Sequence, residues 1–239
     1  MSTAAVESFL RRILLRSSLD QDERNAILSL NGEVQHVRPN RDIIRPGEHT
    51  DTSTLVVNGN VARYDAMRDG DRQTTAIYLP GDMCDLHSVV APVAGWGLVA
   101  LNKATIMKIP HDEIRMAATK FPRVAFALWR DTVVDSSILA KWVGNLGRRS
   151  SRGRLAHLLC ELGIRLETAG LARRDQFWLD LSQGQMADIV GLTPVHVNRT
   201  VQELRREGLI DTDGRNVRVP DWPQLCAAAE FDPVYLLLP

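Results

Sequence analysis

One stretch near the end of the chain, LSQGQMADIVGLTPVHVNRTVQELRREGLI, constrains the fold most strongly. Ser182 is a good helix N-cap, and Gln185 three residues later completes a capping box, so a short helix should follow. Gly191 tolerates the positive φ with which many helices end. Thr193 then caps a second helix, and Pro194 occupies its first position, where a missing N–H costs nothing. The stretch therefore predicts a helix–turn–helix with a glycine in the turn.

The second helix of this motif has two distinct sides. Val197, Val201 and Leu204 follow a spacing of four and three, so they should face inward. The residues of the opposite side are Val195, Arg199, Gln202 and Arg206, with His196 and Asn198 flanking. Arginine can donate two hydrogen bonds to guanine, and Asn or Gln can pair with adenine, so this side can read base edges in a major groove. The alternative is an amphipathic helix with an ordinary solvated face.

A β hairpin should follow the second helix. The segment DTDGRNVRV holds two short β-favouring runs around Asp213-Gly214, as expected for a wing. Arg215 and Arg218 on this hairpin are suited to phosphate contacts. Residues 141–220 hold 13 basic and 9 acidic side chains, a net of +4, whereas residues 1–140 have a net of −1. A basic block that coincides with such a motif favours nucleic acid as the partner.

From about Glu33 to Ile109 the chain consists of short apolar runs separated by turn residues. Many short strands at this spacing predict an antiparallel sandwich or barrel. The turn signals are Gly47, Asn58-Gly59, Asp69-Gly70 and Gly81-Asp82. Because helical patterns lie on both sides of this region, the expected fold class is α+β.

Helix-forming residues dominate from His111 onward. One helix should begin at Pro122, a favourable first position, and run to about Leu146. Gly147 and the arginines and serines after it indicate a hinge. A second helix should occupy about Ser150 to Leu166, followed by the strand-like FWLDL. The N-terminal segment STAAVESFLRRILL fits an amphipathic opening helix.

The long predicted helix carries two broad stripes. One consists of Leu128, Asp135, Ile138, Leu139 and Trp142, and the other of Phe126, Trp129, Val133 and Ala140. A helix with two stripes contacts two partners, here its own β domain and the same helix of a second subunit. We assign the first stripe to the dimer seam. The alternative is that both stripes face one intramolecular core.

These features together resemble the Crp/Fnr family of bacterial transcription regulators. The motif QMADIVGLTPVHVNRTVQELRREGLI is similar to the family's winged helix–turn–helix, and the turns RPGE and LPGD are similar to those of its β-roll. The resemblance implies an N-terminal antiparallel β-roll sensor of the cyclic-nucleotide-binding type, a double-stranded β-helix, over residues 1–121. It further implies a long dimerisation helix with its hinge (122–147), a winged helix–turn–helix (148–222) and a C-terminal tail (223–239).

The resemblance also implies a function. It indicates a cytoplasmic homodimer that regulates transcription by binding a near-palindromic site in double-stranded DNA, with RNA polymerase as a further partner. Residues 193–206 would enter the major groove of each half-site.

Carried over by position, the family's base-reading residues fall on Val195, Asn198 and Arg199. Arg199 matches the arginine that the family commonly uses on guanine. The first position is often glutamate in the family, whereas Val195 can contact a thymine methyl but cannot accept from cytosine, so the half-site should differ. The other residues expected at the DNA are Ser182, Gln183, Thr193, Pro194, His196, Gln202, Arg206, Arg215 and Arg218, with His196 assigned to a phosphate.

The sensor region departs from the family pattern. Cyclic-nucleotide binders of the family hold the ribose with a glutamate and the cyclic phosphate with an arginine, but neither residue type occurs between Gly81 and Asn102. Cyclic AMP and cyclic GMP are therefore disfavoured as ligands in the usual mode. No cysteine precedes Cys84, which disfavours the N-terminal iron–sulfur cluster of the oxygen-sensing branch. No cofactor or metal is predicted, and the effector is unknown.

The candidate effector region consists of Cys84, Asp85, His87 and Trp96. Cys84 and His87 are also potential soft-metal or haem ligands, although ordinary packing is the simpler interpretation. The cysteines Cys84, Cys160 and Cys226 are far apart in the sequence and indicate neither a disulfide framework nor a structural zinc site.

Composition and motifs narrow the function classes. The sequence contains no run of about 18 apolar residues, so it predicts no membrane span. The N-terminus lacks the pattern of a secretory signal. The leading hypothesis is a DNA-binding transcription regulator. The alternative is a ligand-binding signalling module whose winged domain mediates protein interaction. An enzyme ranks third, because we find no phosphate-binding glycine loop, metal quartet or GxSxG elbow.

Overall fold

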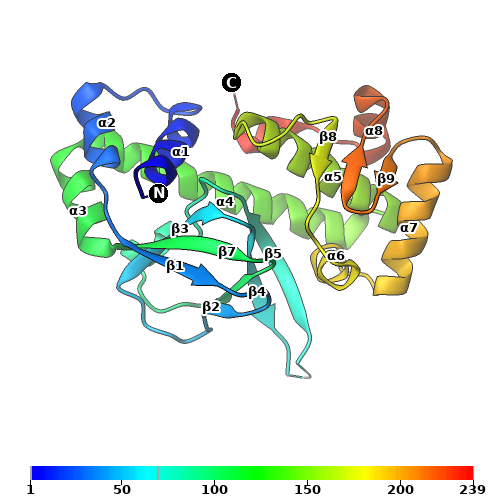
Figure 1. Cartoon of the computed structure of the whole chain (residues 1–239), viewed down its shortest axis with the longest axis horizontal. Coiled ribbons are helices and arrows are strands. Elements are labelled where there is room, and N and C mark those ends of the chain that lie inside the picture. The colour runs from blue at the N-terminus through cyan, green and yellow to red at the C-terminus, as the bar shows by residue number, and fades with distance from the viewer. Residues whose placement is uncertain (1, 69, 239) are drawn as a thin grey trace. The chain divides into compact units, whose positions relative to one another are not determined.

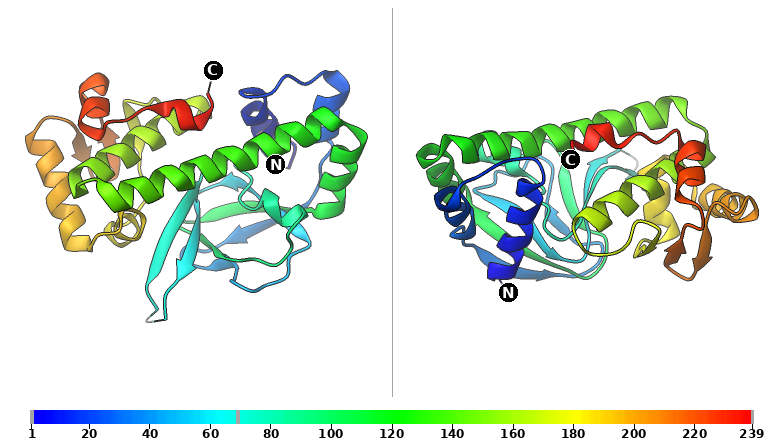
Figure 2. Two further views of the ribbon diagram at one scale, coloured as in Figure 1. Left: turned by 180° about the vertical axis from the view of Figure 1, so that it is seen from behind. Right: turned by 90° about the horizontal axis from the view of Figure 1, so that it is seen from above.

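The computed structural model describes residues 2–68 and 70–238 and divides the chain into two units (Figure 1). The first unit comprises Met1–Ser136 and Leu237–Pro239, and the second comprises Ser137–Leu236. Helix α4 (Pro122–Arg148) is one unbroken helix, so the boundary falls within it (Figure 2). No helix of the described residues is long and apolar enough to cross a membrane.

The β-rich part of the first unit forms two antiparallel sheets, as the turn pattern predicted. One sheet has the order β1 (Glu33–Val37), β7 (Ala104–Pro110), β3 (Thr52–Asn58), and the other has the order β2 (Asp42–Ile44), β6 (Gly97–Ala100), β4 (Val61–Ala66), β5 (Arg72–Tyr78). Gly47, Gly59, Gly70 and Gly81 all have positive φ, which confirms them as turn positions. Asp69, the partner of Gly70 in the predicted turn, lies outside the described residues.

Strands β3 and β7 of the first sheet are buried on both faces. Leu55 and Met107 are paired across β3 and β7 and pack in one core with Phe9 of the first helix. Their neighbours Val56 and Ile106 are also paired but belong to a second core. Since successive side chains of a strand point to opposite faces, one face meets the helices and the other meets the second sheet.

The helices of the first unit are α1 (Ser2–Leu14), α2 (Gln21–Leu28), the 3-10 turn η1 (Leu86–Val89), α3 (His111–Lys120) and the start of α4. Helix α1 confirms the predicted opening helix, with Phe9 and Ile13 buried. Asp20 caps α2 in a full capping box, a signal that the sequence carried but that we did not assign. Arg12 of α1 forms ion pairs with Asp82 and Asp131, so this arginine is held by carboxylates of its own chain.

The second unit contains the predicted helix–turn–helix and its wing. Its elements after α4 are α5 (Ser151–Thr168), β8 (Gln176–Trp178), α6 (Gln183–Val190), α7 (Pro194–Arg206), β9 (Asp211–Asp213), β10 (Asn216–Arg218), α8 (Trp222–Ala229) and the 3-10 turn η2 (Pro233–Leu236). The wing sheet has the order β8-β10-β9. The segment predicted as a tail is folded, because Leu225, Ala229 and Tyr235 are all buried.

Candidate nucleic-acid interface

The local signals around α6 and α7 act as the sequence predicted. The backbone N–H of Gln185 donates to the Ser182 hydroxyl at 3.2 Å, and the N–H of Ser182 donates to the Gln185 side chain at 2.8 Å. Gly191 ends α6 in the left-handed region with φ 63°. The Thr193 hydroxyl accepts from the N–H of His196 at 3.3 Å and so caps α7. These caps fix where α7 begins and hence which of its residues point outward.

The inward side of α7 differs from the prediction at one position. Val197 and Leu204 are fully buried, as expected. Val201 is only half-buried, whereas Thr200 is 1% exposed. The Thr200 hydroxyl donates to the carbonyl of His196 at 2.9 Å, so its polar group is satisfied inside the unit. Helical spacing alone did not separate these neighbouring positions.

The outward side of α7 presents the predicted base-reading residues. Val195 is 81% exposed, and Asn198 and Arg199 are also exposed. Gln202 and Arg206 continue this exposed side toward the end of the helix. The structure therefore brings an apolar, an amide and a guanidinium side chain together on one accessible helix face.

His196, which we assigned to a phosphate, contacts Arg199 in the structure. Its Nε2 accepts from the Arg199 guanidinium at 3.2 Å. Because a guanidinium can only donate, Nε2 is the acceptor in this contact. His196 therefore orients the Arg199 side chain in the free protein.

The three strands of the wing sheet carry further exposed side chains in the second unit. Arg215 is exposed and pairs with Asp180, while Arg218 is exposed on β10. Trp178 on β8 is 63% exposed and lies opposite Asn216 in the sheet register. We did not assign Trp178 from the sequence, although the alternation in FWLDL, with Phe177 buried, was a usable signal. At the start of α6 and α7, Ser182, Gln183, Thr193 and Pro194 are exposed.

The predicted dimer seam on α4 is wrong for most of its residues. Leu128, Ile138 and Trp142 are 7%, 4% and 5% exposed within the single chain. Asp135 forms an ion pair with Arg63 of the same chain. Leu139 is half-buried. This stripe is therefore the intramolecular face of the helix.

The other stripe of α4 is exposed. It follows alternating steps of three and four residues: Phe126, Trp129, Val133, Ser136, Ala140, Val143 and Gly147. Its large apolar members are Phe126, Trp129, Val133 and Val143, at 60%, 64%, 42% and 62% exposure. A strict three-four repeat is the pattern of a coiled-coil contact, so this exposed heptad stripe is the surface available to a partner helix.

In the first unit, Arg63 of β4 lies in a closed polar network. It is 3% exposed, and its guanidinium donates to Asp135 at 2.5 Å and to the Tyr78 hydroxyl at 3.2 Å. The Tyr78 hydroxyl in turn donates to Asp135 at 3.0 Å. The Arg63 guanidinium also lies 5.0 Å from the centre of the Trp96 ring, which contacts His87.

The ionisation of this network follows from its burial. Burial lowers the pKa of Arg63, but its interactions with Tyr78 and Asp135 outweigh burial and raise that pKa. Burial, and after it the charge of Asp135, raises the pKa of Tyr78 well above its usual value. Both shifts favour a charged guanidinium at Arg63 and a protonated phenol at Tyr78.

Two other residues of the predicted effector region, Cys84 and Asp85, are buried. Burial raises the pKa of the Cys84 thiol well above its usual value. The Asp85 carboxylate accepts from the backbone N–H of Thr54 at 2.5 Å and from its hydroxyl at 3.2 Å, which ties η1 to β3. Among the residues that the structure describes, no group of three His, Cys, Asp or Glu residues is placed to hold a metal ion.

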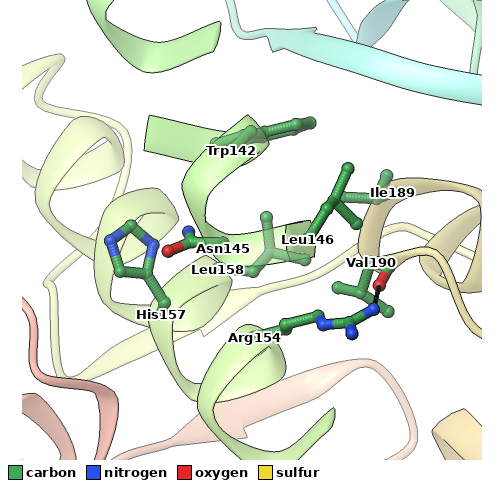
Figure 3. A pocket seen from close by; sticks show the side chains of 8 residues that line it. All are labelled: Trp142, Asn145, Leu146, Arg154, His157, Leu158, Ile189 and Val190. Atoms are coloured by element: carbon green, nitrogen blue, oxygen red, sulfur yellow. Dashed lines mark hydrogen bonds between the residues drawn. The ribbon is translucent and has the colours of Figure 1, made fainter. Parts of the chain in front are cut away.

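A small cavity of about 20 Å³ lies among α4, α5 and α6 in the second unit (Figure 3). Arg154 closes one side by donating to the carbonyl of Val190 at 3.1 Å. His157, which is 1% exposed, lies beside Asn145, and neither of its ring nitrogens has a hydrogen-bond partner. Burial, then the nearby charges of Arg149 and Lys141, lowers the pKa of His157 to about 4. The volume suits one water molecule and excludes a nucleotide.

Two family models match the chain. Residues 34–120 match the cyclic nucleotide-binding domain, and residues 153–228 match the Crp-like helix-turn-helix domain. The two matches fall on the β-rich region and on the region that contains α6, α7 and the wing.

Characterised relatives are regulators of similar length. The chain is 29% identical over 196 residues to the transcriptional activator protein FnrL of Cereibacter sphaeroides, which covers 80% of this chain and 77% of that protein. It is 22% identical over 220 residues to the transcriptional activator protein Anr of Pseudomonas protegens, covering 92% and 90% of the two chains.

Solved structures agree. FixK2 from Bradyrhizobium japonicum matches with a TM-score of 0.76 at 26% identity, covering 83% of this chain and 98% of that one. A CooA mutant from Carboxydothermus hydrogenoformans matches with a TM-score of 0.67 at 18% identity, covering 90% and 94%. The second likeness shows the fold alone.

Proposed function

Because the chain belongs to the Crp/Fnr family of transcription regulators, we propose that it acts as a homodimer on a near-palindromic DNA site. The observation that carries this proposal is the outward face of α7. A capped helix with a buried back presents Val195, Asn198 and Arg199 to solvent. A helix of this kind fits the major groove and reads bases with residues near its N-terminus.

The three side chains suit different bases. The Arg199 guanidinium can donate to O6 and N7 of guanine, and the Asn198 amide can pair with N6 and N7 of adenine. Val195 can contact the methyl group of thymine. Arg206, Arg218 and the N-termini of α6 and α7 then supply phosphate contacts, which position the unit without reading sequence.

The exposed heptad stripe of α4 supports the dimer. Aromatic and β-branched side chains at Phe126, Trp129, Val133 and Val143 would be covered by the same helix of a second subunit. Ala140 and Gly147 lie on the same stripe, and a Cβ added at Gly147 would meet no atom of the described residues within 4 Å. We place the dimer seam on this stripe instead of the one assigned from the sequence.

We further propose that the sensor unit does not bind a cyclic nucleotide in the family's usual mode. A cyclic phosphate needs a cation that is free to pair with it. Arg63 is committed to Asp135 and Tyr78, and the segment between Gly81 and Asn102 contains no arginine or glutamate. Contacts with RNA polymerase and a cytoplasmic location follow the family and belong to the same proposal, as does the absence of enzymatic activity.

Selection of random duplex DNA by the purified protein, with no ligand added, tests the proposal. We expect enrichment of a two-fold symmetric site whose half-sites are about one helical turn apart. No enrichment from a folded dimer would overturn the DNA-reading role and favour a winged unit that binds protein. Enrichment of an asymmetric single site would retain DNA binding and contradict the dimer.

A further inference from the structure

The second unit brings together two cysteines that are distant in the sequence. The Sγ atoms of Cys160 on α5 and Cys226 on α8 lie 3.9 Å apart, although the residues are separated by 66 positions. This is the distance of a weak S–H···S hydrogen bond, in which either thiol can be the donor. A disulfide bond requires about 2.05 Å, so rotations of the two side chains would have to bring the sulfur atoms closer by about 2 Å.

The helices that carry the two thiols are held close by a glycine. Gly163 lies one turn beyond Cys160 on α5, and a Cβ at Gly163 would come within 3.0 Å of the Trp222 ring on α8. Trp222 in turn lies one turn before Cys226. The same faces of α5 and α8 therefore meet at two successive turns. Leu225 and Ala229 are fully buried on α8, which fixes that helix against the unit (Figure 1 shows α8 near the end of the chain).

The two thiols differ in access and in surroundings. Cys160 is fully buried, whereas Cys226 is partly exposed. Burial raises the pKa of both thiols, while the Cys160 hydrogen bond and the charge of Arg174 act in the opposite direction at Cys226. An oxidant from solvent therefore meets Cys226 first, and Cys160 is the thiol that can react with it next.

We propose that Cys160 and Cys226 form a reversible disulfide inside the DNA-binding unit when the protein meets a peroxide. The Cys226 thiol loses its proton, and the thiolate attacks one peroxide oxygen; this gives a sulfenic acid and a hydroxide, which takes up the lost proton and leaves as water. Cys160 then loses its proton and attacks the sulfenic sulfur, and a second water leaves. In total the two thiols lose two electrons and two protons, and hydrogen peroxide is reduced to two waters. A dithiol reductant reverses the bond by exchange.

The bond would brace the unit without altering its DNA-reading face. It closes a loop that contains α6, α7 and the wing, so it restricts the unfolded chain strongly. Neither cysteine belongs to α7 or to the wing strands. The expected effects are a rise of about 10 °C in the unfolding midpoint of this unit and a DNA affinity within about threefold of the reduced protein.

The test uses the full-length protein treated with hydrogen peroxide, quenched, and labelled with a maleimide under denaturing conditions. We expect one labelled thiol per chain in place of three, an intact monomer mass lower by two hydrogens, and a Cys160–Cys226 cross-linked peptide. Cys84→Ser should leave the cross-link unchanged, and Cys226→Ser or Cys226→Ala should abolish it together with the thermal shift. The reaction should also accelerate as the pH rises, because both thiols must ionise.

Three results would overturn the proposal. One is retention of all three thiols under conditions that oxidise an exposed cysteine peptide. Another is sulfinic acid at Cys226 while Cys160 still reacts with maleimide. The third is a cross-link between two chains in place of one within a chain.

Discussion

Arg199 and Arg63 place the same chemical group in opposite surroundings. Arg199 is exposed on α7 in the second unit, and its guanidinium contacts the ring of His196. Arg63 is 3% exposed in the first unit and is bonded to Asp135 and Tyr78. The Arg199 guanidinium is accessible to an outside partner, whereas the Arg63 guanidinium already forms an ion pair with a carboxylate of its own chain.

This difference separates the tasks of the two units. An exposed guanidinium can exchange water for a guanine or a phosphate at little cost. A ligand that sought the Arg63 guanidinium would first have to break a buried ion pair and leave a carboxylate without its partner, which costs several kcal/mol. We therefore expect DNA binding to depend on surface residues of the second unit and not on a small anion in the first.

The largest expected effect is on the dissociation constant of the dimer, which we propose is formed through α4. Trp129→Glu places a carboxylate on the exposed heptad stripe of each subunit, where the two charges would be buried together in a dimer. We expect the dimer dissociation constant to rise by about a thousandfold, as measured by analytical ultracentrifugation.

Met116→Glu is the matched control for this change. Met116 is 60% exposed on α3, close to the 64% of Trp129, but lies outside the stripe. It should leave the dimer unchanged. If both variants weakened the dimer equally, or if neither weakened it, the seam would lie elsewhere.

Arg199→Ala tests the exposed side of the comparison. Each arginine–guanine pair discriminates by about 1–3 kcal/mol, and a dimer makes two such contacts, so affinity for the selected site should fall about a hundredfold. Binding to unrelated DNA should change little. Arg173→Ala removes the same charge from an exposed residue of the second unit outside α7 and serves as the control. Unchanged sequence preference in Arg199→Ala would refute the assignment.

Arg63→Met tests the buried side. It leaves the Asp135 carboxylate without its cation, and we expect a loss of about 3 kcal/mol in the free energy of unfolding of the first unit, measured by urea denaturation. The double variant Arg63→Met/Asp135→Leu should recover most of that loss, since no buried charge then lacks a partner. If the single variant were as stable as the parent, the network would not be the constraint that we describe.

The smallest expected effect is the pH dependence of stability caused by His157. This residue differs from Arg199 because it is a buried polar residue of the second unit. Its pKa is lowered to about 4 from the usual 6.5, so the unfolded chain binds a proton between these values while the folded chain does not. Stability is therefore complete above about pH 6.5 and is lost as the pH falls toward 4, by about 2.6 kcal/mol at pH 4.5. His157→Gln should flatten this dependence in urea titrations from pH 7 to 4.5. An equal slope in both proteins would show that other groups cause the acid loss.

The parts that the sequence predicted well are those decided by local chemistry. The caps at Ser182 and Thr193 and the turn at Gly191 depend on side chains within a few residues of the backbone groups that they satisfy. They located both helices of the motif. The sequence analysis predicted that Val201 faces inward, whereas Thr200 is the buried residue. The burial of this threonine depends on its hydrogen bond to the carbonyl of His196, which helical spacing does not reveal.

The parts that failed depend on contacts between distant residues. Both stripes of α4 contain large apolar side chains, and only the packed structure shows that Ile138 faces inward and Trp129 outward. The Arg63–Asp135 pair joins residues 72 positions apart, and no sequence motif links them. Cys160 and Cys226 looked unrelated for the same reason. Long-range pairing of polar groups has no periodic signature in a single sequence.

The most direct test of the central claim is a DNA-binding titration on the selected symmetric site with nucleotide-free protein. The titration is made with no addition and with millimolar cyclic AMP or cyclic GMP. We predict tight, sequence-selective binding in all three cases, with dissociation constants that agree within about twofold, because Arg63 is already paired and the α7 face is complete. Selective binding that occurs only with a cyclic nucleotide would contradict the account.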